Sequence, residues 1–288
     1  MAVSAISFGT LGIFGKLAQR AGMTLPTLLA LRFGVAALLL GAWLAARGAL
    51  RVPAPRRAAP VVLMGVLYVA QSACFFGSLR TVPAAVTSIL LYTYPVVVAG
   101  LARLLLGEAL TPVRVVALVV ACGGVLLVVD PFGARSLDPA GVALGLGSAA
   151  VYSTYILAGS VLLGEVDAVT ATAGIAATAA IGYVIAGALT GQLTGFDAGG
   201  WAVVAGIATL ATVLPATAFL AGLSRVGPSV ASTVSTLEPA ATAVMAAAFL
   251  GETLSPLRWA GGALVLAAAA VLARATATAA RERVADTR

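Results

Sequence analysis

The sequence predicts an all-α membrane protein with about ten transmembrane helices in two inverted five-helix repeats. Hydrophobic residues make up 61% of its 288 residues and charged residues only 9%, and the mean hydropathy is +1.09. A soluble domain carries about 25% charged residues, so water cannot surround most of this chain. The apolar runs leave room for about ten spans of about 20 residues each.

The two halves of the chain are similar in one register, so that adding 144 to a position in the first half gives its partner. The matched pairs include Pro95 and Pro239, Gly107 and Gly251, Glu108 and Glu252, Pro112 and Pro256, and Arg114 and Arg258. Duplicated bundles of this kind are typical of secondary transporters, in which pseudo-symmetry provides two alternating openings.

The predicted spans follow the apolar runs between charges and turns. They cover residues 1–19, 26–46, 59–79, 84–106, 112–129, 142–163, 168–190, 199–222, 228–250 and 256–273. We divide the chain into a first repeat at 1–135, a second repeat at 136–273 and a cytoplasmic tail at 274–288. No basic residues precede the first apolar run, so we interpret it as a span and not as a signal peptide.

The best-matched stretches, residues 106–114 and 250–258, predict a tight turn between two helices. In each copy a glycine suits a left-handed helix end, a threonine or serine can cap the next helix, and a proline fits its first position. We interpret Glu108 and Glu252 as local caps or ion pairs at the membrane surface, although an ion-binding role is the alternative.

Basic residues near the span ends predict the orientation. With both termini in the cytoplasm, ten basic residues lie on that side, namely Arg47, Arg51, Arg56, Arg57, Arg114, Arg225, Arg274, Arg281, Arg283 and Arg288, against Lys16, Arg20, Arg80, Arg135 and Arg258 outside. The positive-inside rule favours this arrangement. An odd number of spans per repeat makes the second repeat enter from the opposite face.

Pro95 and Pro239 lie near the middle of the fourth and ninth predicted spans. Each removes one backbone hydrogen bond and crowds the carbonyl four residues back, so we expect both helices to kink or break at mid-depth. Non-helical backbone in a bilayer is tolerated where protein or a watery cavity supplies partners. The two breaks therefore indicate the binding site, with a bend used only for packing as the alternative.

Glu238, beside the second break, is the acidic residue that lies deep in a predicted span. A buried charge is costly in a bilayer, so we expect this side chain to be neutral, paired or facing water. Ser232, Ser235, Glu238 and Thr242 share one helical face at spacings of three and four residues. This polar stripe predicts a cavity wall, and the symmetry partner of Glu238 is Tyr94.

Other polar and aromatic residues are candidates for the same cavity. They are Tyr68, Gln71, Ser72, Tyr92, Tyr94, Tyr152, Ser153 and Tyr155, with Thr209 and Thr212 as weaker candidates. Helix packing and the membrane interface are the alternative roles for such residues. Arg32, inside the second span, is a candidate gate or anion contact unless it snorkels to the surface.

Several chemistries are absent from the sequence. It contains no Gly-x-x-x-x-Gly-Lys-Ser/Thr loop, which excludes ATP hydrolysis by this chain. Histidine is missing, so His-based proton relays and serine–histidine triads are excluded. Cys74 and Cys122 lie in apolar runs without a partner at metal-ligand spacing, and we interpret them as small buried hydrophobic residues. We predict no cofactor, no metal and no nucleic-acid partner.

The doubled pattern resembles the EamA-type members of the drug/metabolite transporter superfamily. The resemblance rests on Tyr94-Pro95 with Gly107-Glu108, on Glu238-Pro239 with Gly251-Glu252, and on Arg32. It covers essentially the whole chain. It implies ten helices in two inverted five-helix repeats, a central cavity from helices one, three, four, six, eight and nine, and export of small metabolites across the bacterial inner membrane. Amino-acid exporters of the YddG type are among the similar proteins.

We therefore predict a secondary transporter of amino acids and related amphipathic solutes that works by alternating access, with proton coupling as an open alternative. A channel would need a continuous polar lining. An intramembrane enzyme would alter its substrate chemically. Both remain as alternative functions.

Overall fold

A computed structural model of the chain describes residues 2–49, 55–106, 111–129, 136–162, 166–218, 235 and 237–286. These residues form helices and turns, with no strand among them. Within these described ranges, five helices are long and apolar enough to cross a membrane, and shorter apolar helices accompany them. The five are Leu25–Ala46, Ala58–Ser78, Pro139–Gly159, Val169–Thr190 and Gly200–Ala218. The prediction of an all-α membrane protein is confirmed.

The first half contains α1 (Ala2–Arg20), α2 (Leu25–Ala46), α3 (Pro55–Ser78), α4 (Ala84–Leu91), α5 (Tyr94–Leu106) and α6 (Pro112–Val129). The second half contains α7 (Pro139–Leu162), α8 (Ala168–Thr190), α9 (Gly200–Ala208), the π-helical turn η1 (Thr209–Val213), α11 (Leu237–Met245), the π-helical turn η2 (Ala246–Leu250) and α12 (Pro256–Asp286). The fourth predicted span is thus divided into α4 and α5, and α12 extends through most of the predicted tail.

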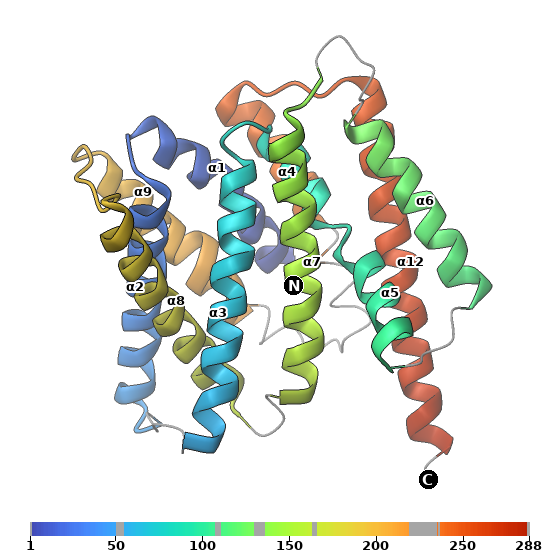
Figure 1. The fold of residues 1–288 in the computed structure, drawn as a ribbon, viewed down its shortest axis with the longest axis horizontal. Helices are drawn as coiled ribbons and strands as arrows, with labels where there is room; N and C mark the ends of the chain where they lie inside the picture. Colours follow the sequence, from blue (N-terminus) through green and yellow to red (C-terminus); the bar gives the residue numbers. More distant parts are fainter. Residues whose placement is uncertain are drawn as a thin grey trace.

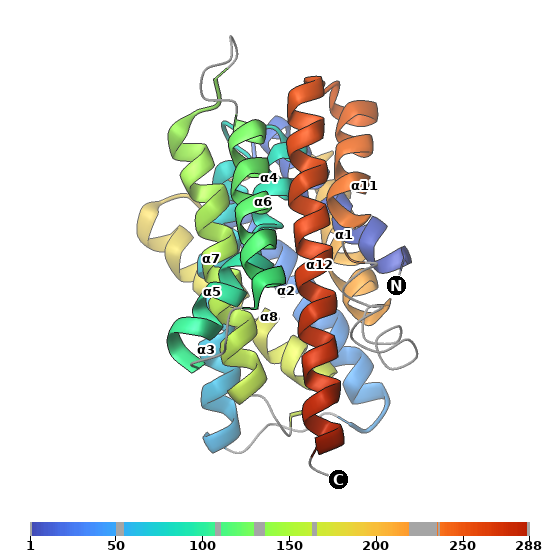
Figure 2. The same cartoon turned by 90° about the vertical axis from the view of Figure 1, so that its right-hand side faces the viewer.

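Two helix pairs form the ends of the bundle. α2 packs on α8 at one end and α6 packs on α12 at the other, with the remaining helices between them (Figure 1). Figure 2 shows α6 and α12 side by side. The contacts between helices repeat when each helix is replaced by its partner in the other half. α3 packs on α7, and their partners, α9 with η1 and α1, pack on each other in the same way. α1 packs on α11, and their partners, α7 and α4 with α5, also pack on each other.

Partner helices in the two halves run in opposite directions. In Figure 1, α3 and α6 run upward, whereas their sequence partners α9 and α12 run downward. α6 therefore ends at the upper edge of the bundle in Figure 1, where α7 begins, and the turn between α1 and α2 lies at the same edge.

Side-chain caps and glycines set the helix boundaries. Asp167 caps α8 by accepting a hydrogen bond from the Thr170 N–H at 3.0 Å, and Gly191 ends the helix with φ of 65°. The turn predicted at 250–258 is confirmed, with a glycine, a proline and a serine in the predicted roles. Gly251 has φ of 68°, Pro256 opens α12, and Ser255 Oγ accepts from the Arg258 N–H at 3.3 Å. Residues 107–110 of the other copy lie outside the described residues.

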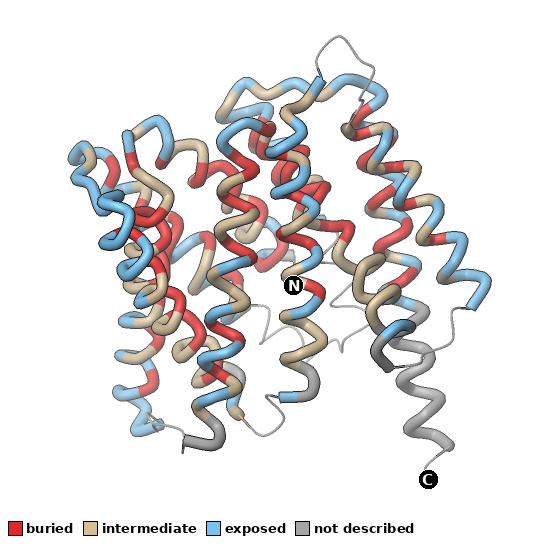
Figure 3. The backbone as a smooth tube through the Cα atoms, viewed as in Figure 1, coloured by how far each residue is buried: buried red, intermediate tan, exposed pale blue. Residues whose placement is uncertain are grey.

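The outer surface of the bundle is apolar, as a lipid environment requires. Leu38, Val119 and Leu189 have exposed fractions of 74%, 67% and 82%, and Figure 3 shows exposed positions along the outward sides of the outer helices. Cys122 is exposed on α6 and Cys74 is half-buried. The prediction that both cysteines are buried is therefore wrong for Cys122, because an apolar run in a membrane helix faces lipid as readily as protein.

Candidate functional site

A cavity of about 220 Å³, which we call the central cavity, lies between α1, α2, α3, α7, α8 and η1. It is lined by Phe8, Phe33, Tyr68, Tyr152, Tyr155, Thr172, Ile175, Ala176, Thr212 and Ala216. Four predicted residues are among them, namely Tyr68, Tyr152, Tyr155 and the weaker candidate Thr212. The lining residues come from the first, third, sixth and eighth predicted spans, which the family resemblance implied and which contain α1, α3, α7 and η1. They also come from α2 and α8, the second and seventh spans. The apolar lining residues gave no signal in the sequence, because similar residues occur throughout the chain.

A row of tyrosine rings leads from this cavity to the break between α4 and α5. Tyr68 lies 5.5 Å from Tyr155 between ring centroids, Tyr155 stacks on Tyr152 at 5.8 Å, and Tyr152 meets Tyr94 edge-on at 5.0 Å. Tyr94 in turn contacts Tyr92 at 5.7 Å. Contacts of this kind fix ring orientations by their quadrupoles as well as by buried area.

The chain turns at Tyr92 and Thr93, two residues before Pro95. Pro95 is therefore the second residue of α5, where its missing N–H costs no helical hydrogen bond. Side chains supply partners for nearby carbonyls, as non-helical backbone in a bilayer requires. Thr93 Oγ1 donates to the Leu90 carbonyl at 2.7 Å. Ser153 Oγ lies 3.1 Å from the Tyr94 carbonyl oxygen and 2.7 Å from that of Ala149, and its one hydrogen can go to either.

Glu238 meets this break from the other half of the chain. The Tyr92 hydroxyl lies 2.8 Å from Glu238 Oε2 and 2.6 Å from the Ser235 carbonyl oxygen. A phenol has one hydrogen to donate, so it cannot donate to both acceptors at once. A proton on Glu238 would complete the arrangement, since the carboxyl would donate to Tyr92 and Tyr92 to Ser235. Pro239 is buried in the first turn of α11.

The remaining polar candidates make hydrogen bonds within a helix or between helices. Gln71 and Ser72 are buried on α3, where Ser72 Oγ donates to Gln71 Oε1 at 3.3 Å. Thr242 Oγ1 lies 3.0 Å from the Gly9 carbonyl of α1, and Thr209 Oγ1 donates to the Ala205 carbonyl at 2.6 Å. Of the predicted polar stripe, Glu238 faces Tyr92 and Thr242 faces α1. Ser232 lies outside the described residues.

Arg32 is buried, with 1% of its surface exposed. Its Nε donates to Thr212 Oγ1 at 2.9 Å, and its guanidinium carbon lies 4.6 Å from the Phe33 ring centroid and 5.5 Å from that of Phe76. The alternative that Arg32 snorkels to the surface is wrong. The side chain lies between Phe33 of α2, Phe76 of α3 and Thr212 of η1, where two aromatic rings and a hydroxyl stabilise a cation.

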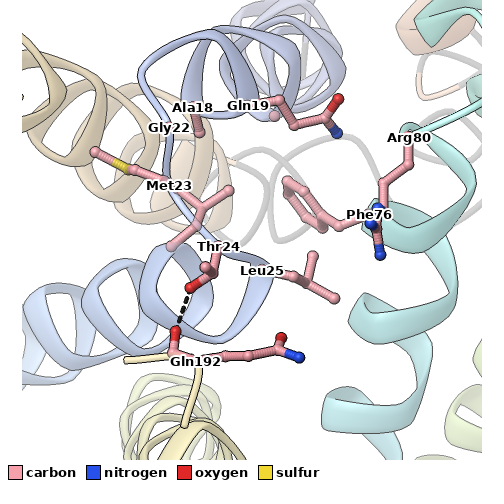
Figure 4. A pocket seen from close by; sticks show the side chains of 11 residues that line it. Ala18, Gln19, Gly22, Met23, Thr24, Leu25, Phe76, Arg80 and Gln192 are labelled. Atoms are coloured by element: carbon pink, nitrogen blue, oxygen red, sulfur yellow. Dashed lines mark hydrogen bonds between the residues drawn. The ribbon is translucent and has the colours of Figure 1, made fainter. Parts of the chain in front are cut away.

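A second cavity, of about 490 Å³, opens at the upper edge. Figure 4 shows its walls, with Phe76 and Arg80 facing the turn between α1 and α2. It is lined by Gly15, Ala18, Gln19, Gly22, Met23, Thr24, Leu25, Leu28, Phe76, Arg80 and Gln192. A hydrogen bond from Thr24 Oγ1 to the Gln192 carbonyl closes one side.

Arg32 lies between the two cavities. One of the rings it contacts, Phe33, lines the central cavity, and the other, Phe76, lines the upper cavity. We call this set of Arg32, Phe33 and Phe76 the partition. A solute that moves between the cavities by this route must displace the partition.

The sequence is similar to one family of known proteins. The sequence matches the EamA-like transporter family over residues 1–130 and 139–274. It is 31% identical over 208 residues to the threonine/homoserine exporter RhtA of Escherichia coli strain K12, an alignment that covers 69% of this chain and 65% of that protein. The chain thus spans less than two thirds of that relative's length.

Two further comparisons agree with the first. RhtA of Salmonella typhimurium strain LT2 is 30% identical over 223 residues, which cover 74% of this chain and 68% of that protein. A protein of known crystal structure has a TM-score of 0.65 and 19% identity, covering 93% of this chain and 94% of its own. At that identity, the structural likeness speaks for the fold alone.

Proposed function

Because the chain belongs to the EamA-like transporter family, we propose that it exports amino acids and related small amphipathic solutes across the bacterial inner membrane by alternating access. The observation that carries the proposal is the aromatic central cavity, which a row of tyrosine rings joins to Glu238. Relatives named as threonine/homoserine exporters favour amino acids as the substrate class. The narrower YddG type stays a prediction.

The proposed topology has ten spans in two inverted repeats, at 1–135 and 136–273, with a tail at 274–288 and both termini in the cytoplasm. Support comes from the opposite directions of partner helices (Figure 1) and from packing contacts that repeat when the halves are exchanged. In such a fold, one half rocks against the other around a fixed site.

The cavity favours a small solute. Its volume of about 220 Å³ is below the range of about 300 to 1,000 Å³ that holds drug-sized ligands. The phenol of Tyr68 and the hydroxyl of Thr212 line the cavity beside the apolar side chains of Phe8 and Ile175. An amino acid presents a polar end and a small side chain to such a wall. The partition at Arg32 would then act as the gate toward the upper cavity.

Glu238 is the proposed proton site. It lies at the junction of both halves, and its contact with Tyr92 accommodates a protonated carboxyl. Binding of the substrate ammonium by Glu238 is the alternative. Gln71, Ser72 and Ser235 are proposed to support the cavity wall.

The test is efflux of labelled threonine from proteoliposomes, with and without an imposed pH gradient. Glu238→Gln should abolish the flux or its dependence on the gradient while the protein remains folded by size-exclusion chromatography. Asp197→Asn, an exposed carboxylate in the α8–α9 loop, is the matched control. Unchanged transport by Glu238→Gln would remove Glu238 from the mechanism, and mass spectrometry of the recovered solute should find it chemically unaltered.

A further inference from the structure

We propose that Arg32 binds the carboxylate of the transported solute, so that the site selects solutes that carry one. This inference rests on the proposed transport function. The observation behind it is a buried nitrogen of the Arg32 guanidinium. Arg32 Nη2 is buried and has no hydrogen-bond partner among the described residues, whereas Nε of the same side chain is bonded to Thr212 at 2.9 Å.

No carboxylate in the described part of the chain serves as a counterion for this cation. The charged and polar groups that act on the guanidinium in the described part of the chain are Tyr68 and Tyr183, and no carboxylate is among them. A buried cation without a partner is costly. Two aromatic faces and a hydrogen bond with the Tyr68 side chain offset part of that cost but leave Nη2 without an acceptor among the described residues. A carboxylate supplies the acceptor and the negative charge that this N–H group lacks.

The guanidinium is within reach of the central cavity. Three residues that line the cavity, Phe33, Tyr68 and Thr212, also touch Arg32. Thr212 lies in the π-helical turn η1, a distortion that is frequent at functional sites. A small side-chain movement of Phe33 or Tyr68 would bring a solute in the cavity against Nη2.

Arg32 and Glu238 cannot hold the two charges of one α-amino acid together. The rings of Tyr155, Tyr152 and Tyr94 come between Tyr68, beside Arg32, and Tyr92, beside Glu238. Neither charged group is among those acting on the other, whereas the ammonium and carboxylate of an α-amino acid share one carbon. Carboxylate recognition therefore falls to Arg32, and Glu238 is left to a proton.

The first experiment uses the unmodified protein. Proteoliposomes loaded with L-threonine take up labelled L-threonine by exchange, and unlabelled L-threonine, L-homoserine or threoninamide compete with it. Threoninamide keeps the amine and the side chain but lacks the carboxylate, so it should compete at least about tenfold more weakly, as the loss of a charge-assisted hydrogen bond predicts. Equal competition by the amide would overturn the inference and leave the transport function standing.

The second experiment changes the guanidinium. Arg32→Gln should weaken competition by threonine about tenfold or more and abolish the preference for threonine over its amide. Arg32→Lys keeps the charge without the guanidinium and should fall between. Arg47→Gln, an exposed arginine beside Trp43 at the end of α2, is the control and should behave as the unmodified protein.

The outcomes separate the two claims. Wild-type affinity and preference in a folded Arg32→Gln variant would overturn carboxylate binding by Arg32. Should Arg32→Gln fail to fold, competition by the amide on the unmodified protein still decides. Absence of any exchange of threonine or homoserine by the unmodified protein would instead overturn the proposed function itself.

Discussion

Glu252 accepts a hydrogen bond from the backbone N–H of Ala84 at 2.9 Å, through Oε1, so a carboxylate of the second half caps a helix of the first half. Its Oε2 accepts from the Ala85 N–H at 3.3 Å. The sequence predicted a local cap or an ion pair with Arg258. The cap exists, but it joins α4 to the turn before α12, where a negative charge is stabilised at the positive end of the helix dipole.

Removing this charge should destabilise the protein. Glu252→Ala leaves two N–H groups of α4 without an acceptor, and we expect a loss of about 1 kcal/mol in the free energy of unfolding. Thermal unfolding in detergent measures the change, with the exposed Asp197→Asn as control. A variant as stable as the unmodified protein would show that the cap contributes nothing.

The contact between α6 and α12 depends on glycine. A Cβ at Gly124 would lie 2.8 Å from the Gly261 carbonyl oxygen, whereas a Cβ at the neighbouring Gly123 would meet nothing within 4 Å. Small residues allow such close backbone approach between membrane helices. We expect Gly124→Ala to destabilise by about 1 to 3 kcal/mol through overpacking, and Gly123→Ala to leave the thermal midpoint unchanged or raise it. Equal effects of both changes would contradict this packing.

The Tyr92 hydroxyl should matter more than the other phenols of the row. Tyr92→Phe removes the hydroxyl that lies between Glu238 and the Ser235 carbonyl, so the Glu238 carboxyl loses this hydrogen bond at a cost of about 1 to 3 kcal/mol. We expect lower thermal stability together with slower threonine efflux. Tyr155→Phe is the control within the same row, and a similar loss in both variants would argue against a special role for Tyr92.

Asp138 should make stability depend on acid pH. The Thr81 side chain, and then the Gly141 N–H at 3.0 Å, hold the pKa of this carboxyl below its usual value of 3.8. The stabilisation is therefore present above the unfolded-state pKa and is lost as the pH falls through the folded-state pKa. The difference in thermal midpoint between the unmodified protein and Asp138→Asn should be constant near neutral pH and shrink below about pH 4. A difference that is independent of pH would contradict this linkage.

Cysteine labelling tests the proposed inversion. In a background with Cys74→Ala and Cys122→Ala, Arg80→Cys at the end of α3 should react with an impermeant maleimide from the outside. Arg225→Cys, at a position outside the described residues, should react only after the membrane is opened. Labelling of both cysteines from the same face would contradict the inverted repeats.

Only part of the candidate site could be predicted from the sequence. Pro95 predicted a break in the fourth span, and the structure divides that span into α4 and α5, because a proline in a long apolar run disrupts the helix wherever it packs. The contact of Tyr92 with Glu238 could not be read in the same way. It joins residues 146 apart, and their proximity depends on how α4 and α11 cross.

Sequence patterning alone determined that this chain is an all-α membrane protein made of two related halves, because hydropathy and a repeated turn are local properties that survive any packing. Tertiary structure decided which polar groups meet. Arg32 faces Thr212 and two aromatic rings, Glu252 caps a helix of the other half, and Cys122 faces outward. In a bilayer both the inside and the outside of the bundle are apolar, so hydrophobicity cannot say which side of a helix faces a neighbour. Only helix packing resolves that choice.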